Sequence, residues 1–489
     1  EITTRLVGSE MCIRDREGNN QMNREKALAK NTLILSIGEF LPKFSSIITL
    51  PIITGGLTKA EMGTYDLIST LVSLFLPVAT LQIQSAAFRF LIDVRKEKKE
   101  TKRIITNIIC FILPTSFIAL VILYFCIESL SPVIRCLICL YFFSDILMLS
   151  MQQIVRGLSN NKLYSTSSVT ISFSNMLLIV LTISIGKQGL VGVLASITIA
   201  TTIGLILLLV KGHILSRIDL SLLSKKTLLE MLSYSWPMIP NSLSNWVLSF
   251  SDRAVLTAFI GLEANAIYSV ANKIPALFTT VQGTFVFAWQ ENASLACKDS
   301  DADTYYSEMF DSIFGILVGI MALLIAATPI LFWVLIRGDY KEAYYQMPIL
   351  FMGMLFSSMA SFIGGIYVAH KKTRSVGITT ILAAACNLII DLVFVHKIGV
   401  FAASISTLVS YAFLAIYRMV DVQKFQSIKF NIRRFCLLIA LLAIMCTVCW
   451  INTLALNMVN IIMGCIVALV VNRKIVKSIL LSLREKMEK

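Results

Sequence analysis

The chain has 489 residues, of which 56% are hydrophobic and only 15% are charged. Soluble proteins have about a quarter charged residues, so this composition excludes an ordinary soluble domain and indicates many membrane-spanning helices. The formal charge of +14 would suit a nucleic-acid-binding protein, but the basic residues flank apolar segments and form no single patch.

The first 21 residues do not resemble the rest of the chain. The piece "LVGSEMCIRDR" is similar to translated sequencing-adaptor sequence, whereas Met22 opens "MNREKALAKN", a short basic lead into the first apolar segment. We therefore predict that residues 1–21 are either non-native or a disordered tail, and we leave them out of the fold prediction.

Apolar stretches recur along the rest of the chain, each long enough to cross a bilayer core of about 30 Å as a helix. They predict an all-α integral membrane protein with about fourteen transmembrane helices. The expected spans are 32–56, 64–90, 104–126, 133–155, 164–185, 189–210, 232–258, 264–290, 307–336, 346–369, 374–395, 399–420, 434–453 and 455–472.

The basic residues alternate between the two sides of these spans. If the amino terminus is inside, most lysines and arginines fall inside, as in "VRKEKKETKR" (94–103), the linker 211–231 and the basic tail. Few fall outside, among them Arg337 and Lys341. This positive-inside pattern predicts that both termini are cytoplasmic. It also predicts that the basic residues bind the head groups of anionic membrane lipids. No nucleic acid is needed to explain the charge.

The cysteines and histidines predict neither a metal site nor a cofactor. Both CxxC pairs, "CLIC" (136–139) and "CTVC" (446–449), lie at or within apolar helices without a nearby histidine. Such cysteines are typical of helix packing.

A weak internal repeat divides the chain. "EMGTYDLIST" (61–70) aligns with "EANAIYSVAN" (263–272), and the segment 161–180 aligns with 372–391. The alignment predicts an N-lobe of six helices (22–210), a cytoplasmic linker (211–231) and a C-lobe of six helices (232–420), followed by two more helices and a basic tail (421–489). Parallel lobes around a central cavity are typical of alternating-access transporters.

Four cations lie at membrane depth in the first two helices of each lobe: Lys43, Arg89, Arg253 and Lys273. A charge at the bilayer centre costs about 2.5–3.5 kcal/mol, so each must face protein or water. Gln82 precedes Arg89 and Asn241 and Asn245 precede Arg253 at helical spacing, which predicts polar stripes along one cavity. The residues leave other interpretations open: Arg89 could extend to the cytoplasmic interface, Lys43 could pair with Glu39, and Arg253 could be neutralised by Asp252 or another buried carboxylate.

Buried carboxylates are candidates for coupling to H⁺ or Na⁺. Glu39, Asp145 and Asp252 lie deep within the predicted spans, whereas Asp66 and Asp391 lie toward span ends and could be interfacial. We therefore expect Glu39, Asp145 or Asp252 to bind the coupling ion.

Prolines interrupt corresponding helices of the two lobes. Pro42 and Pro51 lie in the first span, and Pro237 and Pro240 lie in the seventh. Proline kinks a membrane helix and frees a carbonyl, so these positions are candidate hinges or static bends.

Two segments resemble a known family. "SFSDRAVLTAFIGLEANAIYSVANKI" (249–274) and "CNLIIDLVFVHKIGVFAASISTLVSY" (386–411) are similar to the polysaccharide transporters of the multidrug/oligosaccharidyl-lipid/polysaccharide exporter superfamily, which include the O-antigen flippases. The resemblance covers nearly everything from Met22 onward.

The resemblance implies a flippase in the bacterial cytoplasmic membrane, coupled to H⁺ or Na⁺. Its substrate would be an undecaprenyl-diphosphate-linked oligosaccharide for cell-surface polysaccharide, which polysaccharide polymerase machinery would then extend. Lys43, Arg253 and Lys273 would contact the diphosphate or acidic sugars, and Arg89 would assist at the cytoplasmic mouth.

Three alternatives remain. A multidrug/cation antiporter of the same superfamily would favour an acidic cavity, and a peptidoglycan lipid-precursor flippase would share the cationic one. A membrane polysaccharide polymerase or ligase would need a large outer loop with catalytic groups, and the predicted outer loops are short.

Overall fold

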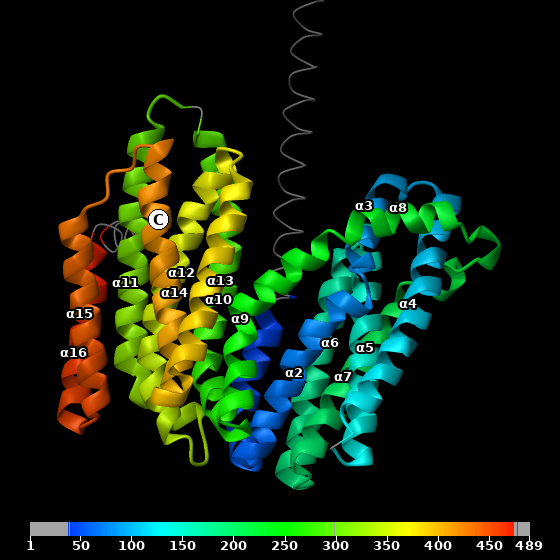
Figure 1. Cartoon of the computed structure of the whole chain (residues 1–489), viewed down its shortest axis with the longest axis horizontal. Coiled ribbons are helices and arrows are strands. Elements are labelled where there is room, and N and C mark those ends of the chain that lie inside the picture. Colours follow the sequence, from blue (N-terminus) through cyan, green and yellow to red (C-terminus); the bar gives the residue numbers. More distant parts are fainter. Residues whose placement is uncertain (1–37, 39, 129, 298, 474–476, 478–489) are drawn as a thin grey trace, which may run out of the picture. The chain divides into compact units, whose positions relative to one another are not determined.

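The computed structural model describes residues 38, 40–128, 130–297, 299–473 and 477 (Figure 1). The segment 1–21, Glu39 and most of the basic tail lie outside these residues, so the predictions for them stay predictions. Among the described residues, every regular element is a helix.

Residues 40–56 are helical and precede the other elements. The α-helices that follow are α2 (Lys59–Ala79), α3 (Ile83–Val94), α4 (Lys98–Cys126), α5 (Pro132–Gly157), α6 (Asn161–Ile179), α7 (Gly189–Lys211), α8 (Lys225–Ser235), α9 (Met238–Phe259), α10 (Leu262–Ala296), α11 (Ala302–Leu335), α12 (Lys341–Ala369), α13 (Thr373–Ile398), α14 (Phe401–Asp421), α15 (Ile432–Ile451) and α16 (Leu454–Val471).

Within the described part of the chain, eleven helices are long and apolar enough to cross a membrane. The predicted class, an all-α integral membrane protein, is confirmed; the count of fourteen spans stays a prediction. α9 and α10 occupy the predicted seventh and eighth spans but are not among the eleven, because polar and charged side chains lower their mean hydropathy.

Two predicted spans are divided in the structure. The second, 64–90, is broken between α2 and α3, where Leu81 and Gln82 have left-handed backbone angles (φ 47° and 57°). The seventh, 232–258, begins only at Met238, because Pro237 lacks an N–H and ends the continuous hydrogen-bond ladder after α8. Apolar composition alone did not reveal these breaks.

The chain forms two compact units. The first contains the described part of Glu1–Ser46 together with Ala79–Leu178 and Ser196–Trp236, and in it α3 packs on α4, α5 and α8. The second contains Ile47–Val78, Ile179–Ala195 and the described part of Pro237–Lys489. The predicted lobes, 22–210 and 232–420, are a different division and stay a prediction.

α12 forms the centre of the second unit. It packs on α10, α11 and α14, and most of its residues are buried. At one end of α10, the Trp289 ring stacks on Phe362 of α12, and its indole N–H donates to the Phe362 carbonyl at 2.8 Å. This packed bundle gives α9 and α10 a rigid support, and both carry the predicted site residues.

Candidate functional site

Two of the predicted cations share one carboxylate. In the second unit, the Arg253 guanidinium of α9 lies 3.4 Å from an Asp66 carboxylate oxygen, and the Lys273 ammonium of α10 lies 3.9 Å from the same oxygen. The Asp66 side chain, on α2, is 2% exposed, whereas those of Arg253 and Lys273 are 11% and 35% exposed. Three helices therefore converge on one ionic centre.

Neutral groups complete this centre. The Ser269 hydroxyl of α10 donates to Asp66, and the Arg253 guanidinium lies 3.4 Å from the Thr70 hydroxyl of α2. We call Asp66, Arg253, Lys273, Ser269 and Thr70 the Asp66 cluster. Two atoms of the cluster, Asp66 Oδ2 and Arg253 Nε, are buried and accept or donate no hydrogen bond among the described residues. An unsatisfied buried polar atom is costly, so both have capacity for a further partner.

A second polar centre surrounds Asp252. Its carboxylate accepts hydrogen bonds from the Tyr268 hydroxyl at 2.6 Å and the Thr407 hydroxyl at 2.8 Å. The Asp391 carboxyl is a neighbour of Asp252 and accepts from the hydroxyl of Ser406, the residue before Thr407, at 3.2 Å. Asp252 and Asp391, which we call the carboxylate pair, are 3% and 0% exposed. Two adjacent buried carboxylates repel each other unless a proton or a cation lies between them.

An amide network extends the second centre. The Asn387 side-chain N–H₂ donates to Ser406 at 3.2 Å, and its carbonyl oxygen accepts from the Ser251 hydroxyl at 3.3 Å. The carboxylate pair therefore lies among oxygen atoms from α9, α10, α13 and α14.

The two centres are linked through neighbouring residues. On α9, Asp252 belongs to the carboxylate pair and Arg253 faces Asp66. On α10, Tyr268 donates a hydrogen bond to Asp252 and Ser269 donates one to Asp66. Consecutive residues of a helix point about 100° apart, so one helix can serve both centres. Any rotation of α9 or α10 that changes one centre also changes the other.

The other predicted site residues have separate surroundings. Lys43 is exposed on the helical segment 40–56. The Gln82 side-chain carbonyl accepts from Ser85 at 3.1 Å. Arg89 is half exposed and pairs with Asp93 at 2.6 Å. Asp145 is half-buried on α5.

These four residues belong to the first unit, so their predicted convergence with Arg253 and Lys273 stays a prediction. In the second unit, Asn245 is exposed on α9. The structure does not describe the side chain of Asn241.

The proline positions are placed as follows. Pro51 lies within the helical segment 40–56, as does Pro42. Pro237 precedes α9 and Pro240 lies in its first turn. Of these four prolines, Pro237 and Pro240 lie at the break between α8 and α9. The hinge roles of all four stay predictions.

Sequence reasoning underestimated Asp66 and Asp391. Both lie near span ends, which suggested an interfacial position, but tertiary packing buries them completely or nearly so. A signal was available for Asp391: Asn387 and Asp391 are spaced i, i+4, so both lie on one face of a helix.

Arg418 is a further buried cation that the sequence did not single out. It is 4% exposed on α14 and donates to the carbonyls of Ala360 and Val376 and to the hydroxyls of Thr379 and Thr380. These neutral acceptors connect α12, α13 and α14, which indicates a structural role.

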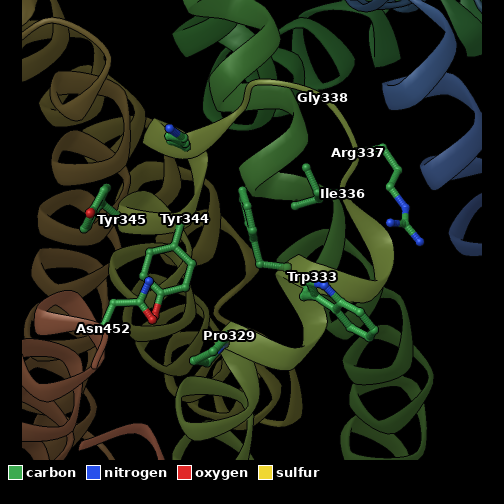
Figure 2. Close-up of a pocket in the computed structure, with 10 residues that line it drawn as sticks. Pro329, Trp333, Ile336, Arg337, Gly338, Tyr344, Tyr345 and Asn452 are labelled. Atoms are coloured by element: carbon green, nitrogen blue, oxygen red, sulfur yellow. The ribbon is translucent and has the colours of Figure 1, made fainter. Parts of the chain in front are cut away.

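A cavity of about 550 Å³ lies elsewhere in the second unit, beside the connection between α11 and α12. Figure 2 shows Arg337 and Trp333 on one side of it and Tyr344, Tyr345 and Asn452 on the other. None of the residues that line it belongs to the Asp66 cluster or the carboxylate pair.

The chain is similar to a known protein family and to several solved structures. A family model described as polysaccharide biosynthesis protein matches residues 28–290. A search of curated proteins found no match.

Several solved structures share the fold. The lipid II flippase MurJ, in an inward closed conformation, is 14% identical with a TM-score of 0.68, covering 92% of this chain and 100% of that one. An inward-facing multidrug resistance MATE family transporter of the MOP superfamily is 13% identical with a TM-score of 0.65, covering 80% and 98%. A MOP superfamily transporter from Pyrococcus furiosus is 13% identical with a TM-score of 0.55, covering 81% and 96%.

Proposed function

The chain belongs to the polysaccharide biosynthesis protein family and has the fold of membrane transporters, and on that premise we propose that it flips a lipid-linked oligosaccharide. The substrate would be an undecaprenyl-diphosphate-linked oligosaccharide, moved from the inner to the outer leaflet of the bacterial cytoplasmic membrane. The charge distribution of the sequence supports the orientation, with both termini in the cytoplasm.

The observation that carries this proposal is the convergence of Arg253 and Lys273 on α9 and α10. Cations inside membrane-spanning helices are costly and are retained where they bind a substrate or an ion. A guanidinium and an ammonium together suit a diphosphate, because both form charge-assisted hydrogen bonds to phosphate oxygens. The unpartnered Nε of Arg253 supplies a donor for such an oxygen.

The carboxylate pair supports coupling to an ion, and Asp252 keeps the role predicted from the sequence. Asp252 and Asp391, with the hydroxyls of Tyr268 and Thr407, offer only oxygen ligands, which suit H⁺ or Na⁺. Because α9 and α10 carry residues of both this pair and the Asp66 cluster, ion binding at the pair would change the positions of Arg253 and Lys273.

A second candidate is a peptidoglycan lipid-precursor flippase. The fold similarity to the lipid II flippase favours it, since a diphosphate head group would use the same cations. A multidrug/cation antiporter is less well supported, because Arg253 and Lys273 would repel a cationic drug.

The first prediction concerns flipping in proteoliposomes. Purified protein with labelled undecaprenyl-diphosphate-linked oligosaccharide should flip the lipid, and Arg253→Ala/Lys273→Ala should lower the rate by roughly a hundredfold, because two charge-assisted contacts are lost. Lys424→Ala, which removes an exposed lysine paired with Asp421, should leave the rate unchanged.

A folded double variant with the wild-type rate would rule out the assigned roles. Parallel liposomes that contain a peptidoglycan lipid precursor separate the two candidates by which lipid is flipped. Mass spectrometry of the lipid-linked sugars that accumulate in a deletion strain identifies the natural substrate.

A further inference from the structure

α2 is attached to α10 by close neutral packing beside the Asp66 cluster. The Gly63 carbonyl accepts a hydrogen bond from the Asn265 side chain at 3.0 Å. A Cβ on Gly63 would lie only 1.9 Å from the Leu262 carbonyl oxygen, so the two backbones touch here. One helical turn further along α2, Asp66 makes its ionic contacts with α9 and α10.

This attachment joins parts of the chain that the repeat assigns to different lobes. α2 falls within the predicted N-lobe, 22–210, whereas α9 and α10 fall within the predicted C-lobe, 232–420. Gly63 and Asp66 lie in the first turns of α2, the end that the proposed orientation places outside. Separation of the lobes at this end therefore requires Asp66 to leave both cations.

Asp66 also occupies the position that a substrate phosphate needs. A carboxylate and a phosphate are both anionic oxygen ligands for guanidinium and ammonium groups, so they compete for the same donors. Asp66 is buried and pairs with no other cation among the described residues, where its Oδ2 also accepts no hydrogen bond.

We propose that Asp66 is an internal counter-ion which the diphosphate head group displaces from Arg253 and Lys273, and that its displacement releases α2 from α9 and α10. This inference rests on the proposed function, and it assigns Asp66 as a positioning residue. Substrate binding would thus supply the free energy that opens the outer end, because the phosphate replaces the ion pairs that α2 loses.

The first arm of the test needs no substrate. Hydrogen exchange is measured by mass spectrometry on the full chain in nanodiscs, over peptides 59–70 and 262–273. Asp66→Asn removes the charge that holds α2, so both peptides should exchange about tenfold faster than in wild type. The matched control is Asp339→Asn. Asp339 also pairs with α2, through Lys59 at 3.0 Å, but the Asp339 side chain is exposed. It should change exchange at 262–273 by less than about twofold.

The second arm adds undecaprenyl diphosphate. The wild-type peptides should exchange faster once the lipid is bound, and Asp66→Asn should bind it about tenfold more tightly, since the competing carboxylate is gone. Ser269→Ala keeps all charges and removes one hydrogen bond to Asp66, so it should shift exchange and affinity in the same direction by a smaller factor. It also provides the test if Asp66→Asn does not fold, which thermal unfolding reports.

The outcomes separate the two proposals. If wild type binds the lipid but neither variant changes affinity or exchange, the counter-ion role is wrong and the flippase function stands. If the variants open α2 while wild type neither binds nor responds to undecaprenyl diphosphate, the proposed substrate is wrong and displacement by it is rejected with it.

Discussion

At the scale of single residues, the charges within the helices could be predicted from the sequence but their partners could not. Arg253 and Lys273 were identified because lysine and arginine are rare in apolar segments. Their shared partner Asp66 was not, because it lies 187 residues before Arg253 and 207 before Lys273, and only folding brings it within 4 Å of both. One of the alternatives for Arg253, neutralisation by a buried carboxylate other than Asp252, is what the geometry shows.

The carboxylate pair leads to a prediction about ion coupling. Asp391→Asn replaces one of two adjacent carboxylates with a neutral amide, so the site no longer needs a proton or a cation to relieve their repulsion. The flipping rate in liposomes with an imposed proton or sodium gradient should become nearly equal to the rate without one.

The control for this measurement is Asp299→Asn, which changes an exposed carboxylate between α10 and α11. It should keep the gradient dependence of wild type. An Asp391→Asn protein that still responds fully to the gradient contradicts the coupling role of the pair.

At the scale of helices, most boundaries follow from the apolar pattern. The predicted spans 104–126, 189–210 and 434–453 differ little from α4, α7 and α15. The breaks after α2 and before α9 were missed because each occupies only two or three residues inside an apolar stretch. Backbone angles such as the left-handed φ of Gln82 depend on packing, which hydropathy does not record.

The close contact between α2 and α10 predicts a strong effect of a single methyl group. Gly63→Ala forces a Cβ against the Leu262 carbonyl, so the helices must separate, at a cost of about 1–3 kcal/mol. Thermal unfolding in detergent should show a clearly lower midpoint than wild type.

Gly377→Ala is the matched control, since Gly377 is exposed on α13 and a Cβ there meets nothing within 4 Å. It should leave the midpoint unchanged or raise it slightly, because alanine favours helix over glycine. Equal midpoints for the two variants would show that the Gly63 contact is not tight in solution.

At the scale of the whole molecule, the class of protein was predictable from the sequence, whereas the division into two lobes stays a prediction. Length, hydropathy and charge alternation identified an all-α membrane protein, which the fold confirms. The repeat predicts two lobes, and the first turns of α2 pack with α9 and α10 in one compact unit. A repeat records duplication of sequence, whereas contacts between the copies depend on the conformation that a transporter occupies.

The central claim, that Arg253 and Lys273 bind the diphosphate of a lipid-linked sugar, is tested most directly by an experimental structure of the chain with undecaprenyl diphosphate bound. We expect phosphate oxygens within about 3.2 Å of the Arg253 guanidinium and the Lys273 ammonium, with Asp66 withdrawn from both. A bound head group elsewhere, with both cations still on Asp66, would contradict the claim.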